Sequence, residues 1–142
     1  MGRILAVDYG RKRCGIAVTD PAGIIASPLT TVRTHDIEAF LLDYDEKETI
    51  EEFVIGYPRK MNNEPSETVK QIDPFIIRLK KLFPGKNITL IDERFSSKSA
   101  MQAMIEGGVK KNKRQDKALV DKISASIILQ VYMETVSKKR EE

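Results

Sequence analysis

The order of the apolar segments is the feature that most restricts how this chain can fold. Three short β-type runs come first, at residues 4–8, 14–20 and 24–32, and a glycine-containing turn joins the first two as an antiparallel hairpin. Helical and strand-like segments then alternate, which gives the order βββαβαβαα. Alternation of this kind predicts an α/β fold in which a five-stranded mixed sheet carries helices on both faces.

Single residues refine this outline. Pro28 lies inside the third run, so we expect that strand at a sheet edge or at a bend. Thr34 or Asp36 could cap the acidic helix that follows. The next helix, at about residues 67–83, contains Pro74, and we expect a kink or a break there. The other segments predict a buried parallel strand at 52–58, a strand at 87–95, a short helix that ends before Gly107 and a long final helix from Lys117.

Length and composition favour one compact unit. The chain has 142 residues, 41% of them hydrophobic, so it can bury a core without metal ions or disulfides. We expect one domain over residues 1–137 and a disordered tail at 138–142. The single cysteine, Cys14, excludes an internal disulfide framework and predicts a small buried thiol. Without a recognisable leader or an apolar run of about 20 residues, a cytoplasmic protein outside the membrane is expected.

The charges are distributed unevenly along the chain. The net charge is only +3, yet residues 36–52 are acidic, whereas the segments GRKR, YPRK and VKKNKRQDK are cationic. One face could therefore attract a polyanion. The competing interpretation is that these charges only keep the surface solvated.

Carboxylates stand where two predicted strands end. Asp8 ends the first strand, and the pair Asp92 and Glu93 ends the strand that begins near Ile88. If these strands are neighbours, their acids can converge. Because side chains alternate between the two faces of a sheet, only one member of the pair can face the same side as Asp8. The sequence leaves open which one.

A third acid, Asp121, lies near the start of the final helix, where Ser124 and Ala125 share its face and would let the helix backbone approach the sheet. Three carboxylates in one pocket repel one another unless cations join them. Oxygen ligands without a His or Cys cluster favour Mg²⁺ or Mn²⁺, and two such ions can stabilise both oxygens of an in-line phosphodiester displacement. Taken singly, however, each acid is more often a turn residue or a helix cap.

Four blocks, in order and over nearly the whole chain, resemble motifs of the YqgF/RuvX family. They are DYGRKRCGIAVTD, VIGYPRKMNNE, DERFSS and VDKISASIILQVY. The resemblance implies an RNase H-like fold and a metal-dependent endonuclease that acts on nucleic-acid phosphodiesters, with a role in 5′-end maturation of pre-16S rRNA. It further implies that Asp8, Glu93 and Asp121 are the catalytic, metal-binding acids, and it prefers Glu93 over Asp92 for that reason only.

Cationic residues in or near these blocks are expected to hold the nucleic-acid backbone. They are Arg11, Lys12, Arg13, Arg59, Lys60, Arg94, Lys110, Lys111, Lys113 and Arg114. Arg13 and Arg94 match the arginines of the family motifs, and they could instead brace the acids. Aromatic residues make up only 6% of the chain, so little base stacking or sequence specificity is expected.

Several alternatives stay open. Pre-rRNA is favoured as the partner, but the protein could be a Holliday junction resolvase that acts on DNA, or a non-catalytic nucleic-acid-binding or ribosome-assembly module. A symmetric junction would favour a homodimer, whereas trimming one rRNA end needs only a monomer. The Asp-x-Gly hairpin also resembles that of sugar-kinase and actin-type ATPases, which enclose a nucleotide between two such domains. This chain has room for one.

Overall fold

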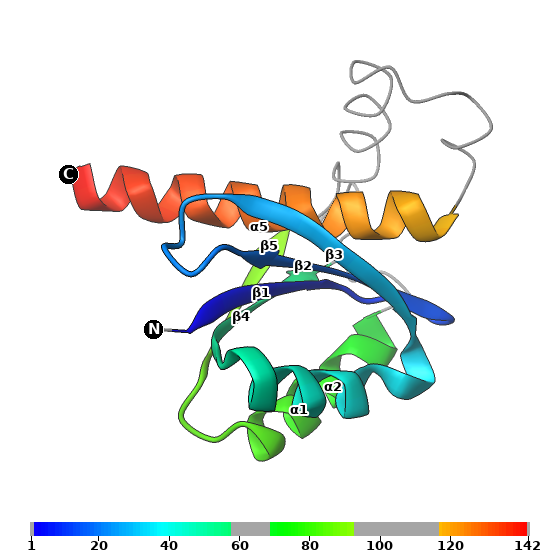
Figure 1. Cartoon of the computed structure of the whole chain (residues 1–142). Coiled ribbons are helices and arrows are strands. Elements are labelled where there is room, and N and C mark those ends of the chain that lie inside the picture. Colours follow the sequence, from blue (N-terminus) through cyan, green and yellow to red (C-terminus); the bar gives the residue numbers. More distant parts are fainter. Residues whose placement is uncertain (1, 58–68, 93–116, 142) are drawn as a thin grey trace.

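The computed structural model describes residues 2–57, 69–92 and 117–141. Its strands are β1 (Arg3–Asp8), β2 (Arg13–Thr19), β3 (Ala26–Arg33), β4 (Ile50–Tyr57) and β5 (Asn87–Asp92). Its helices are the short 3-10 helix η1 (Thr34–Asp36) and the α-helices α1 (Ile37–Glu48), α2 (Val69–Leu82) and α5 (Lys117–Glu141), as Figure 1 shows. The short helix expected before Gly107 lies outside the described residues.

The five strands form one mixed sheet in the order β3-β2-β1-β4-β5. The β1–β2 and β2–β3 pairs are antiparallel, whereas β4 runs parallel to both β1 and β5. The predicted hairpin and the predicted five-stranded mixed sheet are therefore confirmed. Pro28 lies in β3, an edge strand, and it pairs with Ala17 where the β2–β3 register shifts. Proline is tolerated at such an edge because no further strand requires the hydrogen-bond donor that proline lacks.

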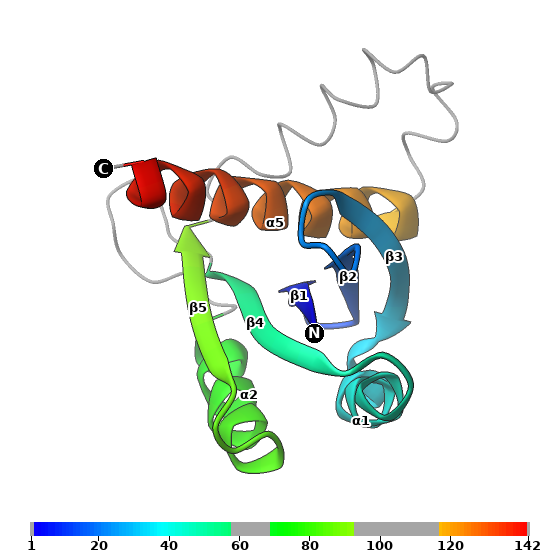
Figure 2. The same ribbon diagram turned by 60° about the vertical axis from the view of Figure 1, so that its left-hand side comes forward.

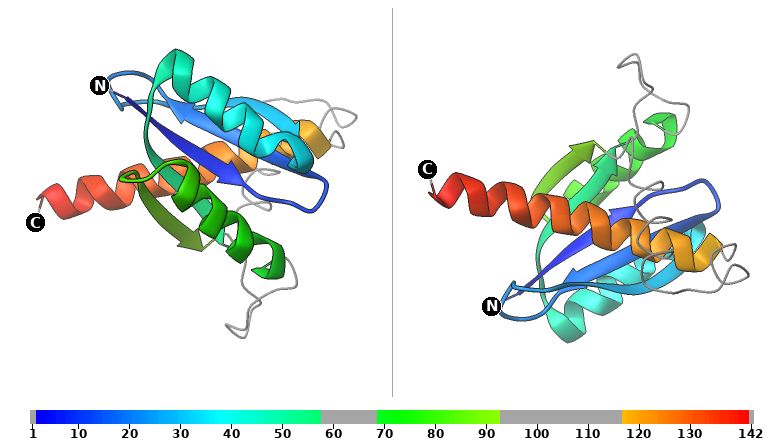
Figure 3. Two further views of the ribbon diagram at one scale, coloured as in Figure 1. Left: turned by 90° about the horizontal axis from the view of Figure 1, so that it is seen from below. Right: turned by 90° about the horizontal axis from the view of Figure 1, so that it is seen from above.

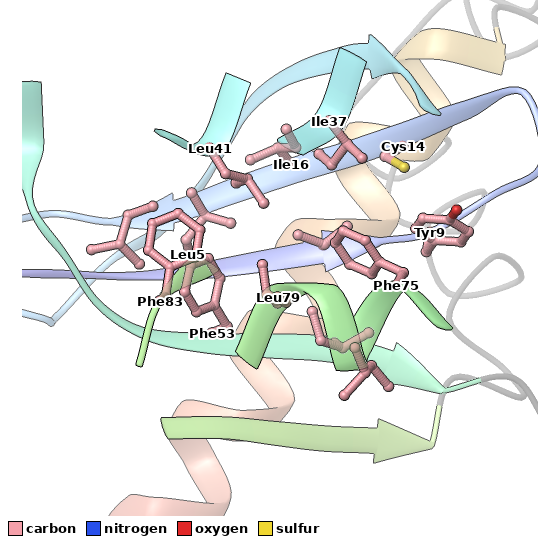
Figure 4. Close-up of a cluster of buried hydrophobic side chains, with 14 of the residues drawn as sticks. Leu5, Tyr9, Cys14, Ile16, Ile37, Leu41, Phe53, Phe75, Leu79 and Phe83 are labelled. Carbon is pink, nitrogen blue, oxygen red and sulfur yellow. The ribbon is translucent and has the colours of Figure 1, made fainter. Parts of the chain in front are cut away.

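Helices cover both faces of the sheet, as predicted. Figures 2 and 3 show α1 and α2 against one face and α5 crossing the other. The strands alternate accordingly, since Leu5 and Val7 belong to the core below α1 and α2, whereas Ala6 belongs to the core below α5. The first core is large and includes the side chains labelled in Figure 4. The second is built from smaller residues, namely Ala6, Ala17, Val54, Ala125, Ile128 and Leu129.

The structure differs from two expectations about the helices. Asp36 occupies the N-cap position of α1 but makes no side-chain capping hydrogen bond, and the Thr34 hydroxyl donates to the carbonyl oxygen of Gly10. Of the kink or break expected at Pro74, the break is absent, because α2 is continuous from Val69 to Leu82. Fully buried apolar side chains on either side of the proline hold α2 against the sheet, and their burial outweighs one lost backbone hydrogen bond.

The final helix, α5, is the longest element that the structure describes. It runs for 25 residues, from Lys117 to Glu141, so residue 137, the expected domain boundary, falls inside it. The division into a domain and a tail stays a prediction. In the described ranges, no helix combines the length and the apolar character that a bilayer span requires.

Candidate active site

Asp8 lies at the carboxyl end of β1, on the face of the sheet that α5 covers. Ile4 and Ala6 pack in the core below α5, and alternation along the strand assigns Asp8 to the same side. Asp8 pairs across the hairpin with Gly15 of β2. The side chain is half-buried. The predicted first acid is thus placed at the edge of the α5 interface.

Gly15 allows the backbone of α5 to lie close to the sheet beside Asp8. A Cβ atom built on Gly15 would lie 2.8 Å from the amide nitrogen of Lys122 and closer still to the carbonyl group of Asp121. No side chain larger than hydrogen fits there without moving the helix. The backbone of α5 at Asp121 therefore rests directly on the residue that pairs with Asp8, which brings the first and last predicted acids to one place.

Arg13 links the two elements electrostatically. Its Nε donates a hydrogen bond to Oδ2 of Asp121 in an ion pair whose side chains are 34% and 23% exposed. Arg13 shares a face of β2 with Gly15, two residues later, so the guanidinium projects toward α5. Of the two roles that the sequence suggested for this arginine, the structure displays contact with an acid. Contact with phosphate stays a prediction.

The side chain of Cys14 lies on the opposite face of β2 from Gly15, and its pKa depends on burial and on the charges of the same two acids. Burial raises the pKa of Cys14 above its usual value, and the negative charges of Asp8 and Asp121 act in the same direction. Both carboxylates therefore influence one common atom. Cys14 is fully buried, which confirms the predicted structural role and leaves the thiol neutral at physiological pH.

Ser124 is a buried hydroxyl one helical turn after Asp121. It is 1% exposed, and its Oγ has no hydrogen-bond partner within the part of the chain that the structure describes. Ser126 behaves differently, because its Oγ donates to the carbonyl oxygen of Ile123 at 2.7 Å. Ala125 and Ile128 are also buried, so the predicted sheet-facing side of α5 is confirmed. A buried polar atom without a partner among the described residues, one helical turn from Asp121, fits a site that is completed by a bound, hydrated group.

The two acids fit a hard divalent cation. Their carboxylates supply oxygen alone, which favours Mg²⁺ or Mn²⁺ over Zn²⁺. Within residues 2–57, 69–92 and 117–141, no three His, Cys, Asp or Glu side chains gather closely enough to hold an ion. The third predicted ligand, Glu93, lies outside these ranges.

The cations predicted to bind nucleic acid are only partly described. Arg11 and Lys12 are exposed in the turn that directly follows Asp8 and Tyr9. Arg13 is described above, and the remaining predicted cations lie outside the described residues, namely Arg59, Lys60, Arg94, Lys110, Lys111, Lys113 and Arg114.

Two residues shape the site in ways that the sequence analysis does not predict. A glycine inside an apolar strand often marks a close backbone approach, which is the signal that could identify Gly15. Thr34 carries no such signal, because a threonine in this position is equally typical of a helix cap, yet its hydroxyl donates to the turn between β1 and β2.

Comparison with known proteins agrees with this geometry. The family model described as "RuvX: Holliday junction resolvase" matches residues 2–135. A relative from Phocaeicola vulgatus is 54% identical over 135 residues, which cover 95% of this chain and 97% of the relative. One from Porphyromonas gingivalis is 55% identical over 134 residues, covering 94% and 97%. Both carry the name "Putative pre-16S rRNA nuclease".

Solved structures extend the comparison to the fold. A Fowlpox virus resolvase in complex with Holliday junction DNA aligns with a TM-score of 0.55 over 94% of this chain and 98% of that chain. RuvC of T. thermophilus with a Holliday junction substrate aligns with a TM-score of 0.53 over 94% and 96%. Both are 16% identical to this chain, so the likeness concerns the fold, and the RNase H-like prediction is confirmed. The prediction of a phosphodiester-hydrolysing nuclease is confirmed by the family match and the relatives. Since its motifs, its fold and its relatives agree, this chain belongs to the RuvX family.

Proposed function

We propose that this protein is a metal-dependent endonuclease that matures the 5′ end of pre-16S rRNA in the cytoplasm. One observation carries the catalytic part of the proposal, namely the convergence of Asp8 and Asp121 around Gly15. The names of the relatives from P. vulgatus and P. gingivalis support the choice of an rRNA precursor as substrate.

The proposed catalytic acids are Asp8, Glu93 and Asp121, which would hold Mg²⁺ or Mn²⁺ together. A bound ion would supply Lewis acidity to activate water and to stabilise the departing oxygen. The choice of Glu93 over Asp92 rests on the resemblance of the DERFSS block to the family motif, since neither side chain belongs to the part of the chain whose side chains the structure describes.

The cations around the acids have two proposed tasks. Arg13 offsets the repulsion between Asp8 and Asp121 and orients the latter through its hydrogen bond. Arg11 and Lys12, exposed beside the acids, would contact backbone phosphates, together with the other predicted cations. Because each neutralised phosphate releases counterions, binding should weaken steeply as salt is added. Base specificity should be low, since phosphate contacts carry no sequence information.

A DNA junction is the second candidate substrate. Both solved structures of similar fold were obtained with Holliday junction DNA, although at 16% identity they inform only on the fold. Cleavage of a two-fold symmetric junction would require a homodimer, whereas one rRNA end can be trimmed by a monomer. A non-catalytic role in ribosome assembly would need binding but no turnover.

Cleavage assays with three substrates test the proposal. Full-length protein is incubated with Mn²⁺ or Mg²⁺ and with an rRNA precursor, an unrelated single-stranded RNA or a four-armed DNA. We expect preferred cleavage of the precursor, leaving a 5′-phosphate. The matched control is Asp8→Asn, which removes one charge at almost constant volume and should abolish cleavage while nucleic-acid binding persists.

Each other outcome has a distinct meaning. Cation-dependent cleavage by Asp8→Asn at the wild-type rate would exclude the assigned role of Asp8. Preferred cleavage of the four-armed DNA would favour the resolvase alternative. Binding without cleavage of any substrate by the wild-type protein would favour the assembly module.

A further inference from the structure

Thr34 holds the turn between β1 and β2 through two hydrogen bonds. The Thr34 hydroxyl donates to the carbonyl oxygen of Gly10 at 2.6 Å, and the Thr34 amide donates to the carbonyl oxygen of Lys12 at 3.0 Å. Thr34 is the first residue after β3, whose last residue, Arg33, pairs with Arg13 at the start of β2. The edge strand therefore delivers Thr34 directly to the turn.

A third contact ties Thr34 to the core. Its Oγ1 lies 3.5 Å from the sulfur of Cys14. A hydroxyl has a single hydrogen, and Thr34 donates it to Gly10, so the thiol is the donor in this contact. Because burial raises the pKa of Cys14, the thiol keeps its hydrogen at neutral pH. A chain of hydrogen bonds thus runs from Cys14 through Thr34 to Gly10.

The turn needs such support because of what it carries. Arg11 and Lys12 are exposed and consecutive, and their like charges repel each other. The backbone is also tight, since a Cβ atom on Gly10 would lie 2.6 Å from the carbonyl oxygen of Arg13. Arg13 in turn holds Asp121. A change of turn conformation would therefore move the exposed cations relative to the acids.

We infer that Thr34 is a positioning residue that fixes the turn so that Arg11 and Lys12 meet the nucleic-acid backbone beside the acids. This inference rests on the proposed function. Thr34 does not touch the acids through any described contact, and it acts through the carbonyl groups of Gly10 and Lys12. Its contribution should therefore affect substrate binding more than the chemical step.

Two variants separate the hydroxyl from the rest of the side chain. Thr34→Val keeps the shape and the backbone amide but loses the hydroxyl, whereas Thr34→Ser keeps the hydroxyl. Thr135→Val is the matched control, because its Oγ1 donates to the carbonyl oxygen of Val131 within the same helix, α5. Cys14 is the only cysteine in the chain, so its rate of labelling by a thiol reagent reports directly on how firmly the turn is held.

For Thr34→Val we expect about fivefold to tenfold faster Cys14 labelling, the change expected for the loss of one hydrogen bond. Binding of single-stranded RNA should weaken by a similar factor and depend less steeply on salt, because Arg11 and Lys12 are no longer held where they contact the phosphates. In cleavage assays KM should rise while kcat changes little. Thr34→Ser should restore wild-type values, and Thr135→Val should match wild type throughout.

The inference and the function on which it rests can fail separately. Unchanged labelling, or faster labelling with unchanged RNA affinity and salt dependence, would overturn the inference while leaving the nuclease proposal intact. An equal loss of kcat in Thr34→Val and Thr34→Ser would also overturn it. Wild-type protein that binds neither RNA nor four-armed DNA would overturn the proposed function and the inference with it.

Discussion

The guanidinium of Arg13 is paired with the carboxylate of Asp121, although the two residues are 108 positions apart in the chain. The pair joins the start of β2 to the first turns of α5, next to the contact between Gly15 and the α5 backbone. Arg13 therefore contributes both to the contact between α5 and the sheet and to the charge balance of the acids. Its replacement should change the stability of the protein and its affinity for a metal ion.

Replacement of Arg13 by Gln should lower the free energy of unfolding by about 1 kcal/mol at low salt, as for a partly exposed ion pair, and by less at high salt. Mn²⁺ should stabilise the variant more than it stabilises the wild type, because the ion would then offset the negative charge that Arg13 no longer compensates. Thermal unfolding with and without Mn²⁺ measures both effects. Arg13→Lys keeps the charge but not the planar guanidinium, so its stability and its response to Mn²⁺ should lie between those of the wild type and Arg13→Gln. Identical Mn²⁺ shifts in all three proteins would contradict a shared site.

Substitution of Gly15 by Ala should push α5 away from the sheet, because the new methyl group meets the backbone of Asp121 and Lys122. We expect a loss of about 1–3 kcal/mol in stability, as for other overpacked interiors, together with loss of cleavage. Gly85→Ala is the control. Gly85 has a φ of 85°, so alanine is strained there, but its methyl group would meet nothing within 4 Å. Similar destabilisation with intact cleavage is expected for the control, and intact cleavage in Gly15→Ala would refute the role of this contact.

The stability of the protein should fall as the pH rises above about 9. Burial raises the pKa of Cys14 above its ordinary value of 9.0, so the unfolded chain loses the thiol proton before the folded protein does. This contribution is complete below the unfolded pKa and is lost above it, at up to about 1.4 kcal/mol per pH unit. Tyr9 and Tyr44, whose pKa values burial also raises, add the same effect above pH 10.

Denaturant unfolding of wild type and Cys14→Ala between pH 8 and pH 10 tests this assignment. Between about pH 9 and pH 10 the variant should lose less stability than the wild type, whatever its absolute stability, because it lacks the thiol that titrates first. Parallel curves for the two proteins would show that another group is responsible.

Replacement of Ser124 by Ala should leave the metal-free protein equally stable or stabilise it by about 1–2 kcal/mol. The Ser124 hydroxyl is buried without a partner among the described residues, and removal of such a group relieves its desolvation penalty. Ser126→Ala is the control, because its hydroxyl already has an acceptor on Ile123. Thermal unfolding compares the two. A loss of stability larger in Ser124→Ala than in Ser126→Ala would mean that the Ser124 hydroxyl is satisfied in solution.

Local pattern determined much of the fold. Hydrophobic periodicity placed all five strands and the described α-helices, but not the 3-10 helix η1, because a strand or an α-helix depends mainly on residues close in sequence. The prolines show the limit of such reasoning. Pro28 lies at a sheet edge as its chemistry requires, whereas Pro74 sits within a continuous helix because buried neighbours compensate for it.

The sequence by itself determined that acids follow strand ends, that a helix with a small-residue face carries Asp121, and that the motifs are those of a nuclease family. Only the tertiary structure decided which groups meet. It placed Gly15 against the backbone of Asp121 and paired Arg13 with that acid. It also directed the Thr34 hydroxyl to the carbonyl oxygen of Gly10 in the turn, and not to the start of a helix. The reason is that a side chain's partners come from distant segments, and packing of the sheet against α5 selects them after local structure has formed.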